Sequence, residues 1–289
     1  MITSIKKFLF GDKTAEIEQY LNDNFTFSGK YAIYDDYTVD VDGDVTVKNS
    51  DIEYLTGKLF HFGIIKGEFK CDNCQNLKSL KGAPEEVNGV FNCSSCTSLK
   101  SLRGVPEKFS GVFNCSSCTS LTSLKGAPKE VDKDFVCDGC ENLKSLEGGP
   151  EKVGGDFSCN NCKKLKSLKG APKTITGNFN CTGCESLKDL EGSPETVGGS
   201  FYCNMCKKLK SLKGAPKEVT NDFCCTDCNE LRNLKGSPTN IGGNIDCSNC
   251  YKLKKLKGAP DKLEGSIICT GCPKLSITKQ IGRNYDIQK

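Results

Sequence analysis

Cysteine is the residue type with the greatest capacity for chemistry in this sequence, and its spacing is regular. Of 21 cysteines, 20 fall in ten Cys-x-x-Cys pairs that recur every 22 residues without an insertion. Two consecutive pairs would supply the four thiolates that a structural zinc ion or an iron–sulfur cluster requires. The candidate metal ligands are Cys71, Cys74, Cys93, Cys96, Cys115, Cys118, Cys137, Cys140, Cys159, Cys162, Cys181, Cys184, Cys203, Cys206, Cys225, Cys228, Cys247, Cys250, Cys269 and Cys272.

A second interpretation places both cysteine columns in a buried core. Free cysteine behaves as a small hydrophobic residue and is among the most buried residue types. Cys71 lies two residues after Phe69, so on a strand both side chains point to the same side. Zinc cysteines usually come as two separated pairs on a compact module, whereas these pairs form an unbroken column. We therefore favour buried thiols and no cofactor, with zinc as the alternative.

The compartment bears on the state of these thiols. The chain does not start with an apolar run of signal-peptide length, and no stretch approaches the roughly 18 apolar residues of a membrane span. We therefore expect a cytoplasmic protein without a membrane partner, in which the thiols stay reduced. Cys224 alone lies outside the pairs, at an expected outward strand position, and we predict that it is the most reactive thiol.

The other columns of the repeat indicate which elements carry the cysteines. A phenylalanine or isoleucine precedes each pair, and two leucines follow it at positions such as Leu77 and Leu80. Their three-residue spacing suits a turn or a short 3₁₀ segment better than a strand. Pro84, which lacks an amide hydrogen, suits a corner, and Gly82 permits the backbone angles of a turn. One unit is therefore a short strand, a bend, an apolar arc and a Gly-x-Pro turn that leads to a branched residue such as Val87.

Units of this size must stack, because 22 residues cannot bury their own apolar face. Stacking lays each phenylalanine, cysteine and leucine onto its copy in the next unit, with the strands pairing in parallel about 4.8 Å apart. The predicted fold class is a repeat solenoid. It has a parallel sheet on one side, turns or short 3₁₀ segments on the other, and a small α+β cap at the N-terminus.

The chain divides into four parts on this reasoning. Residues 1–44 lack the period and form the N-terminal α+β cap, and residues 45–68 form a degenerate capping rung. Residues 69–275 form the ten repeats, and residues 276–289 form the C-terminal cap. Atypical units at both ends are what an open solenoid needs to cover its exposed core.

The caps carry their own local signals. Residues 12–24 are expected to form a helix with one apolar side. Residues 31–47 alternate enough to predict two strands, joined by a hairpin at Asp42-Gly43, because glycine accepts the positive φ of such a turn. The residues expected to close the C-terminal end are Ile277, Ile281 and Ile287.

The segment Phe69-x-Cys71-x-x-Cys74-x-x-Leu77-x-x-Leu80 resembles the leucine-rich repeat motif, and most of all its cysteine-containing variant. The resemblance implies that Phe69 and Cys71 fill the strand leucine positions and that Cys74 fills the Asn/Cys ladder position. It also implies a parallel sheet on whose outer face partners commonly bind. The complete pattern further resembles leucine-rich-like proteins of tailed bacteriophages, which implies a viral origin.

Basic residues also recur in columns. The residue after the first leucine is basic in eight of nine units, and the residue three positions later is basic in seven. Stacking places these charges in parallel stripes that suit an anionic partner such as a nucleic acid backbone. The alternative is a solvated face on which lysine stems cover the leucine edges. The candidate anion-binding residues are Lys78, Lys100, Lys144, Lys166, Lys188, Lys210, Arg232 and Lys254.

Two observations weigh against nucleic acid. No aromatic column interleaves the lysines, so unpaired bases would have no stacking platform. The chain has 40 basic and 36 acidic residues, and the resulting net charge of +4 is small. The residues expected to point outward from the sheet are mostly small and polar. The apolar exceptions are Val90, Val112, Val136 and Tyr202.

An enzyme is the class that the sequence favours least. Thiols, hydroxyls and lysines repeat evenly, whereas a catalytic site needs unlike groups that converge at one place. His61 is the only histidine, which excludes a mechanism that needs two. The leading hypothesis is a non-catalytic protein-binding scaffold. By the phage resemblance, it would modulate a host protein, for example a defence component, in the host cytoplasm. The alternatives are thiolate metal binding and polyanion or nucleic-acid binding.

Overall fold

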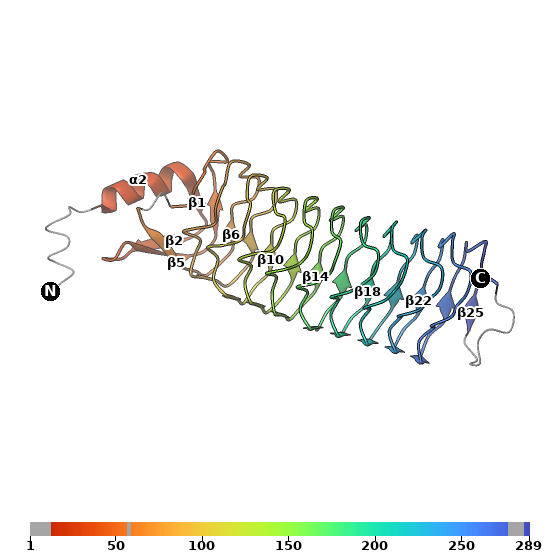
Figure 1. Cartoon of the computed structure of the whole chain (residues 1–289). Helices are drawn as coiled ribbons and strands as arrows, with labels where there is room; N and C mark the ends of the chain where they lie inside the picture. Colours follow the sequence, from red (N-terminus) through yellow and green to blue (C-terminus); the bar gives the residue numbers. More distant parts are fainter. Residues whose placement is uncertain (1–12, 57–58, 277–285) are drawn as a thin grey trace.

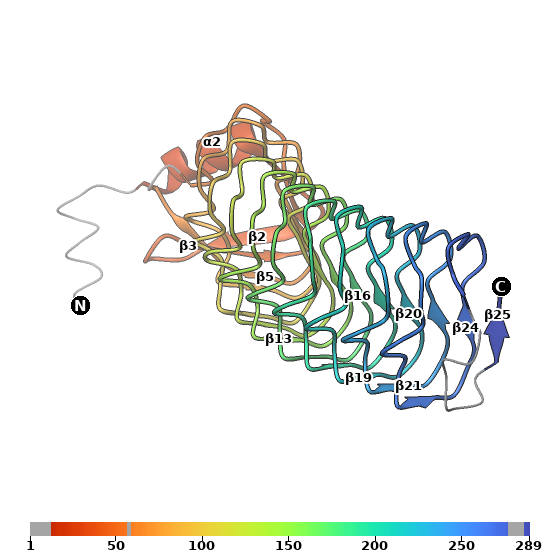
Figure 2. The ribbon, with the colours of Figure 1, turned by 45° about the vertical axis from the view of Figure 1, so that its right-hand side comes forward.

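The computed structural model describes residues 13–56, 59–276 and 286–289. Within them the chain forms a β-solenoid of about 11 turns, with a helix at its N-terminal end (Figure 1). Successive turns, here called rungs, are displaced along one axis, as the rotated view in Figure 2 shows. The predicted repeat solenoid with a small N-terminal cap is confirmed.

One long sheet runs the length of the solenoid. Its 13 strands pair in the order β1-β4-β6-β8-β10-β12-β14-β16-β18-β20-β22-β24-β25. All neighbours are parallel except β1 and β4. The strands are β1 (Phe25–Phe27), β4 (Val45–Val47), β6 (Phe69–Lys70), β8 (Phe91–Asn92), β10 (Phe113–Asn114), β12 (Phe135–Val136), β14 (Phe157–Ser158), β16 (Phe179–Asn180), β18 (Phe201–Tyr202), β20 (Phe223–Cys224), β22 (Ile245–Asp246), β24 (Ile267–Ile268) and β25 (Ile287–Gln288).

A second parallel sheet has eight strands, in the order β23-β21-β19-β17-β15-β13-β11-β9. It is built on the branched column of the repeat, because β-branched side chains pack well on a pleated surface. Sequence reasoning identified this column without assigning it a strand. The strands are β9 (Lys108–Phe109), β11 (Glu130–Val131), β13 (Lys152–Val153), β15 (Thr174–Ile175), β17 (Thr196–Val197), β19 (Glu218–Val219), β21 (Asn240–Ile241) and β23 (Lys262–Leu263).

A continuous apolar core fills the inside of the rungs. The phenylalanine rings from Phe69 to Phe223 stack on one another, with neighbouring centroids 5.1–5.4 Å apart. Both leucine columns and all twenty paired cysteines are buried beside them. Cys71 and Phe69 are both fully buried, which confirms that the two side chains share the inward side of the strand.

Left-handed backbone positions turn the chain at two places in each rung. The second residue inside each cysteine pair has φ between 56° and 74°, as in Asn73 and Gly139. The glycine of the Gly-x-Pro turn is also left-handed, and at Gly104 a Cβ would lie 2.5 Å from the backbone of Leu80. In the arc, the amide of Leu77 donates to the carbonyl of Cys74 at 3.0 Å. The described arcs therefore consist of isolated turns and contain no 3₁₀ helix.

The N-terminal cap covers the open end of the core. The helix α2 (Thr14–Asn24) matches the predicted helix and buries Ile17 and Leu21 completely. A four-stranded sheet adjoins it, in the order β2-β3-β5-β7. Its strands are β2 (Lys30–Ile33), β3 (Thr38–Asp42), β5 (His61–Ile65) and β7 (Glu86–Val87).

The predicted hairpin at Asp42-Gly43 was wrong. Strand β3 pairs with β2 and β5, whereas β4 pairs with β1 and β6, so the two strands lie in different sheets. In a solenoid a strand pairs with the neighbouring rung, and a short glycine-containing link turns a corner instead of reversing the chain. The antiparallel hairpin joins β2 to β3, and its turn contains Tyr37 with a φ of 66°.

At the C-terminal end, β25 extends the long sheet by pairing in parallel with β24. Ile287 lies beside Ile267 and packs against the core, as expected of a closing residue. Ile277 and Ile281, the other predicted closing residues, lie outside the described residues. In the part of the chain that the structure describes, no helix has the length and apolar character needed to cross a membrane.

Candidate functional site

The two cysteine columns form a regular hydrogen-bonded ladder inside the solenoid. The Sγ of the second cysteine in a pair donates to the backbone carbonyl of the first cysteine in the preceding rung, as Cys96 does to Cys71 and Cys162 to Cys137. Nine such bonds join successive rungs, with sulfur–oxygen distances of 3.1–3.4 Å. Each thiol thereby provides a donor to a backbone carbonyl that is buried away from water.

This environment holds the first cysteine of each pair in its neutral form. A side-chain hydrogen bond with Cys118, which favours the protonated thiol, and the burial of the side chain raise the pKa of Cys93 well above its ordinary value. The same two causes, with Cys162 as the partner, raise the pKa of Cys137. For Cys181, burial is the larger cause of the raised pKa and the side-chain hydrogen bond with Cys206 is the second. A thiolate is the form that binds metals, so these pKa shifts oppose ligation at neutral pH.

The cysteine columns differ from a metal centre in the arrangement of their donor groups. Among the described residues, no three His, Cys, Asp or Glu side chains converge as metal ligands would. The second thiol of each pair from Cys96 to Cys272 is a hydrogen-bond donor to a backbone carbonyl, whereas a metal ligand would have to be a thiolate without that proton. The metal-binding alternative stays a prediction whose test is elemental analysis of protein purified under reducing conditions.

Cys224 differs from every other cysteine in its exposure. It lies in β20 at an outward position and is partly exposed, whereas the twenty paired cysteines are buried. Burial of part of the side chain, together with the charges of Asp246 and Asp222, raises the pKa of Cys224 to about 12. Access therefore favours reaction at Cys224, while the low thiolate fraction slows it.

The predicted basic stripes lie on the arcs. We call the three columns that begin at Lys78, Ser79 and Lys81 and continue through nine rungs the basic face. It contains sixteen basic and three acidic residues, in a protein whose net charge is only +4. The basic charge of the molecule is therefore concentrated on this face, and the rest of the sequence is net acidic.

Carboxylates neutralise only part of the basic face. Glu147 pairs with Lys169 at 3.0 Å and Glu191 with Lys213 at 2.5 Å, and Lys78 pairs with Glu53 at 2.8 Å. The remaining predicted anion-binding residues, all exposed, have no carboxylate within 4.0 Å among the described residues. They are Lys100, Lys144, Lys166, Lys188, Lys210, Arg232 and Lys254.

Neighbouring columns use their charges differently. In the column directly after the cysteine pairs, glutamate and lysine alternate over four rungs, and Glu141–Lys163 and Glu185–Lys207 pair at 2.7 and 2.6 Å. Beside Lys163, the pKa of Glu141 is lowered by this hydrogen bond. Exposed pairs of this kind contribute little stability, about 0–1 kcal/mol each. The unpaired lysines of the basic face therefore contrast with columns in which the same repeat compensates its charge.

Several aspartate and asparagine side chains at the edge of the long sheet have a structural role. The Oδ1 of Asp134 accepts the amide of Asp156 at 2.8 Å, and the Oδ1 of Asp156 accepts the amide of Asn178 at 2.7 Å. Asn178 continues the pattern to Ser200 at 2.8 Å. This Asx ladder joins rungs at the corners before β14, β16 and β18, and Asp222 and Asn244 form the same bonds before β22 and β24. Sequence reasoning missed it, although the Asp/Asn column with a period of 22 residues was a visible signal.

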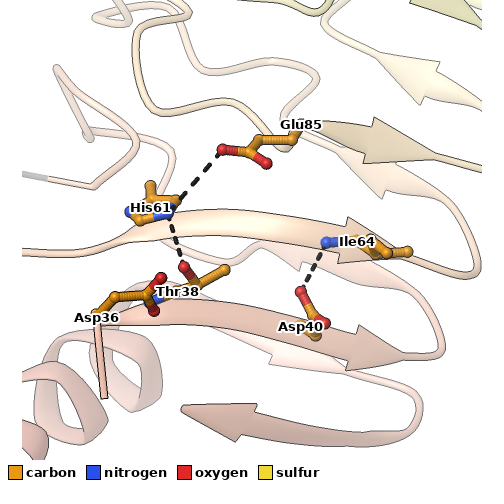
Figure 3. A network of polar contacts seen from close by, with 6 residues as sticks. All are labelled: Asp36, Thr38, Asp40, His61, Ile64 and Glu85. Carbon is orange, nitrogen blue, oxygen red and sulfur yellow. Dashed lines mark hydrogen bonds and ion pairs between the residues drawn. The ribbon is translucent and has the colours of Figure 1, made fainter. Parts of the chain in front are cut away.

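Polar side chains of different chemical types lie near one another on the four-stranded N-terminal sheet, with both short and long distances between them (Figure 3). The Oγ1 of Thr38 lies 2.7 Å from Nε2 of His61, and Glu85 lies 4.0 Å from the same nitrogen. The amide of Thr38 donates to Asp36, and this bond is the main reason that the pKa of Asp36 is lowered. The side chain of His61 is 45 % exposed and that of Glu85 is 73 % exposed, so this network joins β3 and β5 at the surface.

Comparison with protein-family models, with curated proteins and with solved structures found no significant match.

Proposed function

We propose that this protein is a non-catalytic scaffold that binds another protein along the outer face of the 13-stranded sheet. The single observation that supports the proposal is the contrast between the two sides of the same strands. The inward residue is phenylalanine or isoleucine in every rung from β6 to β24. The outward residues form the sheet face and vary from rung to rung. They are Lys70, Asn92, Asn114, Val136, Ser158, Asn180, Tyr202, Cys224, Asp246 and Ile268.

This variation is informative because duplication copies both sides of a strand equally. Residues 89–99 and 111–121 are identical, so the repeat is capable of keeping its outward residues. A rigid sheet with differing side chains provides an extended surface that can distinguish partners. The catalytic alternative is less supported, since the described polar groups that meet on the N-terminal sheet are exposed and loosely spaced.

We also propose a biological origin and a cellular location for the protein. The resemblance of the repeat to the leucine-rich repeat, and to leucine-rich-like proteins of tailed bacteriophages, supports a phage factor that engages a host protein in the host cytoplasm. Twenty buried unpaired thiols are compatible with a reducing compartment, where they stay unpaired.

The experiment is capture of partners by the purified protein and by a sheet-face variant. The variant carries lysine, the residue already present at Lys70, in place of Asn92, Val136, Tyr202 and Ile268. We expect wild-type protein to enrich a defined protein and the variant to lose most of it, because the new charges would be desolvated on binding.

The matched control is a basic-face variant, with glutamine in place of Lys144, Lys166 and Lys188. This control should retain the partner. Enrichment of no protein by the wild type, or equal enrichment by both variants, would overturn the proposal. The folded state of each variant is checked by circular dichroism before use.

A second candidate function is polyanion binding, and the unpaired lysines of the basic face favour it. Neighbouring rungs place like charges about 4.8 Å apart, which an anionic chain would neutralise. Heparin and double-stranded DNA are the probes, titrated at increasing salt. The affinity should fall steeply with salt and should drop in the basic-face variant, since released counterions drive such binding. Replacement of the ion-paired Lys163 and Lys207 by glutamine is the control and should change the affinity less.

A further inference from the structure

One rung departs from the repeat in a way that the fold does not require. The second residue inside the cysteine pair is left-handed in every rung, and it is asparagine, serine, glycine or aspartate in nine of ten. In the tenth it is Met205, with a φ of 57°. An unbranched apolar side chain gains nothing locally from this conformation, which Asn, Asp and Gly adopt most readily. The Met205 side chain is nevertheless 52 % exposed.

Two more departures lie in the same pair of rungs. Tyr202 replaces the small polar residue of the sheet face in β18, and Cys224 replaces it in β20. The two residues are directly opposite each other in the parallel register. The amide of Met205 donates to the carbonyl of Thr226, which ties the methionine to the rung that holds Cys224. We call Tyr202, Met205 and Cys224 the Tyr202 patch.

The charged residues in the columns that contain the patch are all acidic. The basic residues nearest in sequence, Lys207 and Lys208, lie beyond the cysteine pair, and Glu185 pairs with Lys207. In the three rungs from β18 to β22, the outward columns contain Asp222, Asp227 and Asp246 and no lysine or arginine. Asp246 is directly opposite Cys224 in the register. The Oδ1 of Asp222 accepts the amide of Asn244 at 2.7 Å, which holds this carboxylate in place. The negative charges of Asp246 and Asp222 are felt at the patch, because they contribute to raising the pKa of Cys224.

We propose that the Tyr202 patch is the docking site for a cationic protein segment that presents one apolar side chain flanked by lysine or arginine. Tyrosine and methionine supply an aromatic surface and a polarisable thioether for the apolar side chain. The three aspartates supply charge complementarity for the flanks, which mainly sets specificity and the rate of association. A methionine at a left-handed position is expected where binding, not folding, selects the residue.

This inference rests on the proposed function and names the part of the sheet face that carries it. The probe is a fluorescein-labelled synthetic peptide with a central phenylalanine and two lysines on each side. Two comparison peptides replace the phenylalanine by serine, or the four lysines by glutamate. Binding is measured by fluorescence anisotropy at low salt. The wild type should bind the first peptide at least about tenfold more tightly than either comparison peptide, since hot-spot contacts carry most of the affinity.

The variants return the patch to residues that the repeat already uses. Tyr202→Asn reproduces Asn180, and Met205→Asn reproduces Asn73, so neither change should disturb the fold. The double variant should bind the lysine–phenylalanine peptide at least about tenfold more weakly. Tyr251→Asn is the control, because it removes a 53 % exposed tyrosine from a different column and should leave binding unchanged.

A second measurement shows directly whether the peptide occupies the Tyr202 patch. The bound peptide should slow alkylation of Cys224, whereas the glutamate peptide should not. Absence of binding to the wild type, or equal affinity for the serine peptide, would overturn the inference. So would binding that the double variant retains. If a captured partner is lost from the sheet-face variant but kept by the double variant, the proposed function stands and only the Tyr202 patch is excluded as its site.

Discussion

At the scale of single residues, the ten cysteine pairs have a structural explanation. The first cysteine of each pair packs beside the phenylalanine stack, and the second donates to a carbonyl of the preceding rung. Thiols are small enough to lie in a column about 4.8 Å apart and still carry a weak donor. Chemistry at thiolates and packing as thiols require opposite protonation states, and the raised pKa values favour packing.

The first prediction concerns the ladder. Cys162→Ala removes the donor to Cys137 and leaves a small cavity, so the free energy of unfolding should fall by about 1–3 kcal/mol. Urea unfolding followed by circular dichroism measures the change. Cys224→Ala is the matched control and should cost less than about 0.5 kcal/mol, because its side chain is partly exposed. An equal loss of unfolding free energy in both variants would contradict a stabilising role for the thiol-to-carbonyl hydrogen bond.

The second prediction concerns Cys224. Iodoacetamide at pH 8 should label Cys224 before any other cysteine, as peptide mass spectrometry would reveal. Its pKa of about 12 means that the thiolate fraction, and so the labelling rate, should rise about tenfold per pH unit from pH 8 to 10. Faster labelling of Cys225 or Cys228 would contradict the prediction. Cys224→Ser should abolish the first labelling event.

At the scale of the element, the rung that contains β16 turns its corner by combining an acceptor of the preceding rung with a glycine. Asp156 reaches forward to the amide of Asn178, and Gly177 lies where the carboxylate passes. A Cβ on Gly177 would lie 2.2 Å from the Oδ1 of Asp156. The glycine that precedes the Asx position is therefore needed for the side chain of the preceding rung.

The third prediction tests this coupling. Asp156→Ala should lower the free energy of unfolding by about 1–2 kcal/mol, and Gly177→Ala by about 1–3 kcal/mol. In the Asp156→Ala background, Gly177→Ala should cost less, since only the backbone contact at 2.8 Å remains. A double-mutant cycle in urea measures the difference. Gly139→Asn is the control and should be nearly neutral, because asparagine occupies the same left-handed position in other rungs. Additive losses would contradict the coupling.

At the scale of the whole molecule, the cysteine columns add up the contributions of many thiols to the free energy of unfolding. Each thiol with a raised pKa adds to the same pH dependence, and many such thiols line this core, among them Cys71, Cys115 and Cys225. A raised pKa means that the folded protein holds the proton more tightly than the unfolded chain. The stabilisation is therefore complete below the unfolded pKa of about 8.5 and is lost as the pH rises above it.

The fourth prediction follows from this loss of stability at high pH. The urea midpoint should be nearly constant from pH 6 to 8 and should fall steeply from about pH 8.5 to 10. Each ionising thiol contributes up to about 1.4 kcal/mol per pH unit. The measurement is made with excess reductant, and the control is a return to pH 7, which should restore the midpoint if no disulfides have formed. A midpoint that stays flat to pH 10 would show that the thiols do not titrate with unfolding.

The sequence alone determined the solenoid, because a period of 22 residues repeated without insertion allows each apolar column to be buried only against its own copy. The inward position of Phe69 and Cys71, the helix α2 and the basic stripes followed from the same spacing and patterning. These features depend on local sequence and on translation between copies, which a single chain displays directly.

Only the tertiary structure decided which hydrogen bonds and strand pairings join neighbouring rungs. The carbonyl partner of Cys162, the amide partner of Asp156 and the pairing of β3 with β5 instead of β4 all depend on contacts between rungs. The thiol bond of Cys162 joins positions 25 residues apart, which a spacing of 22 residues does not align. The bond of Asp156 joins equivalent positions, but whether a side chain reaches the next amide depends on the corner geometry set by packing. For this reason the two ladders emerged only from the folded chain.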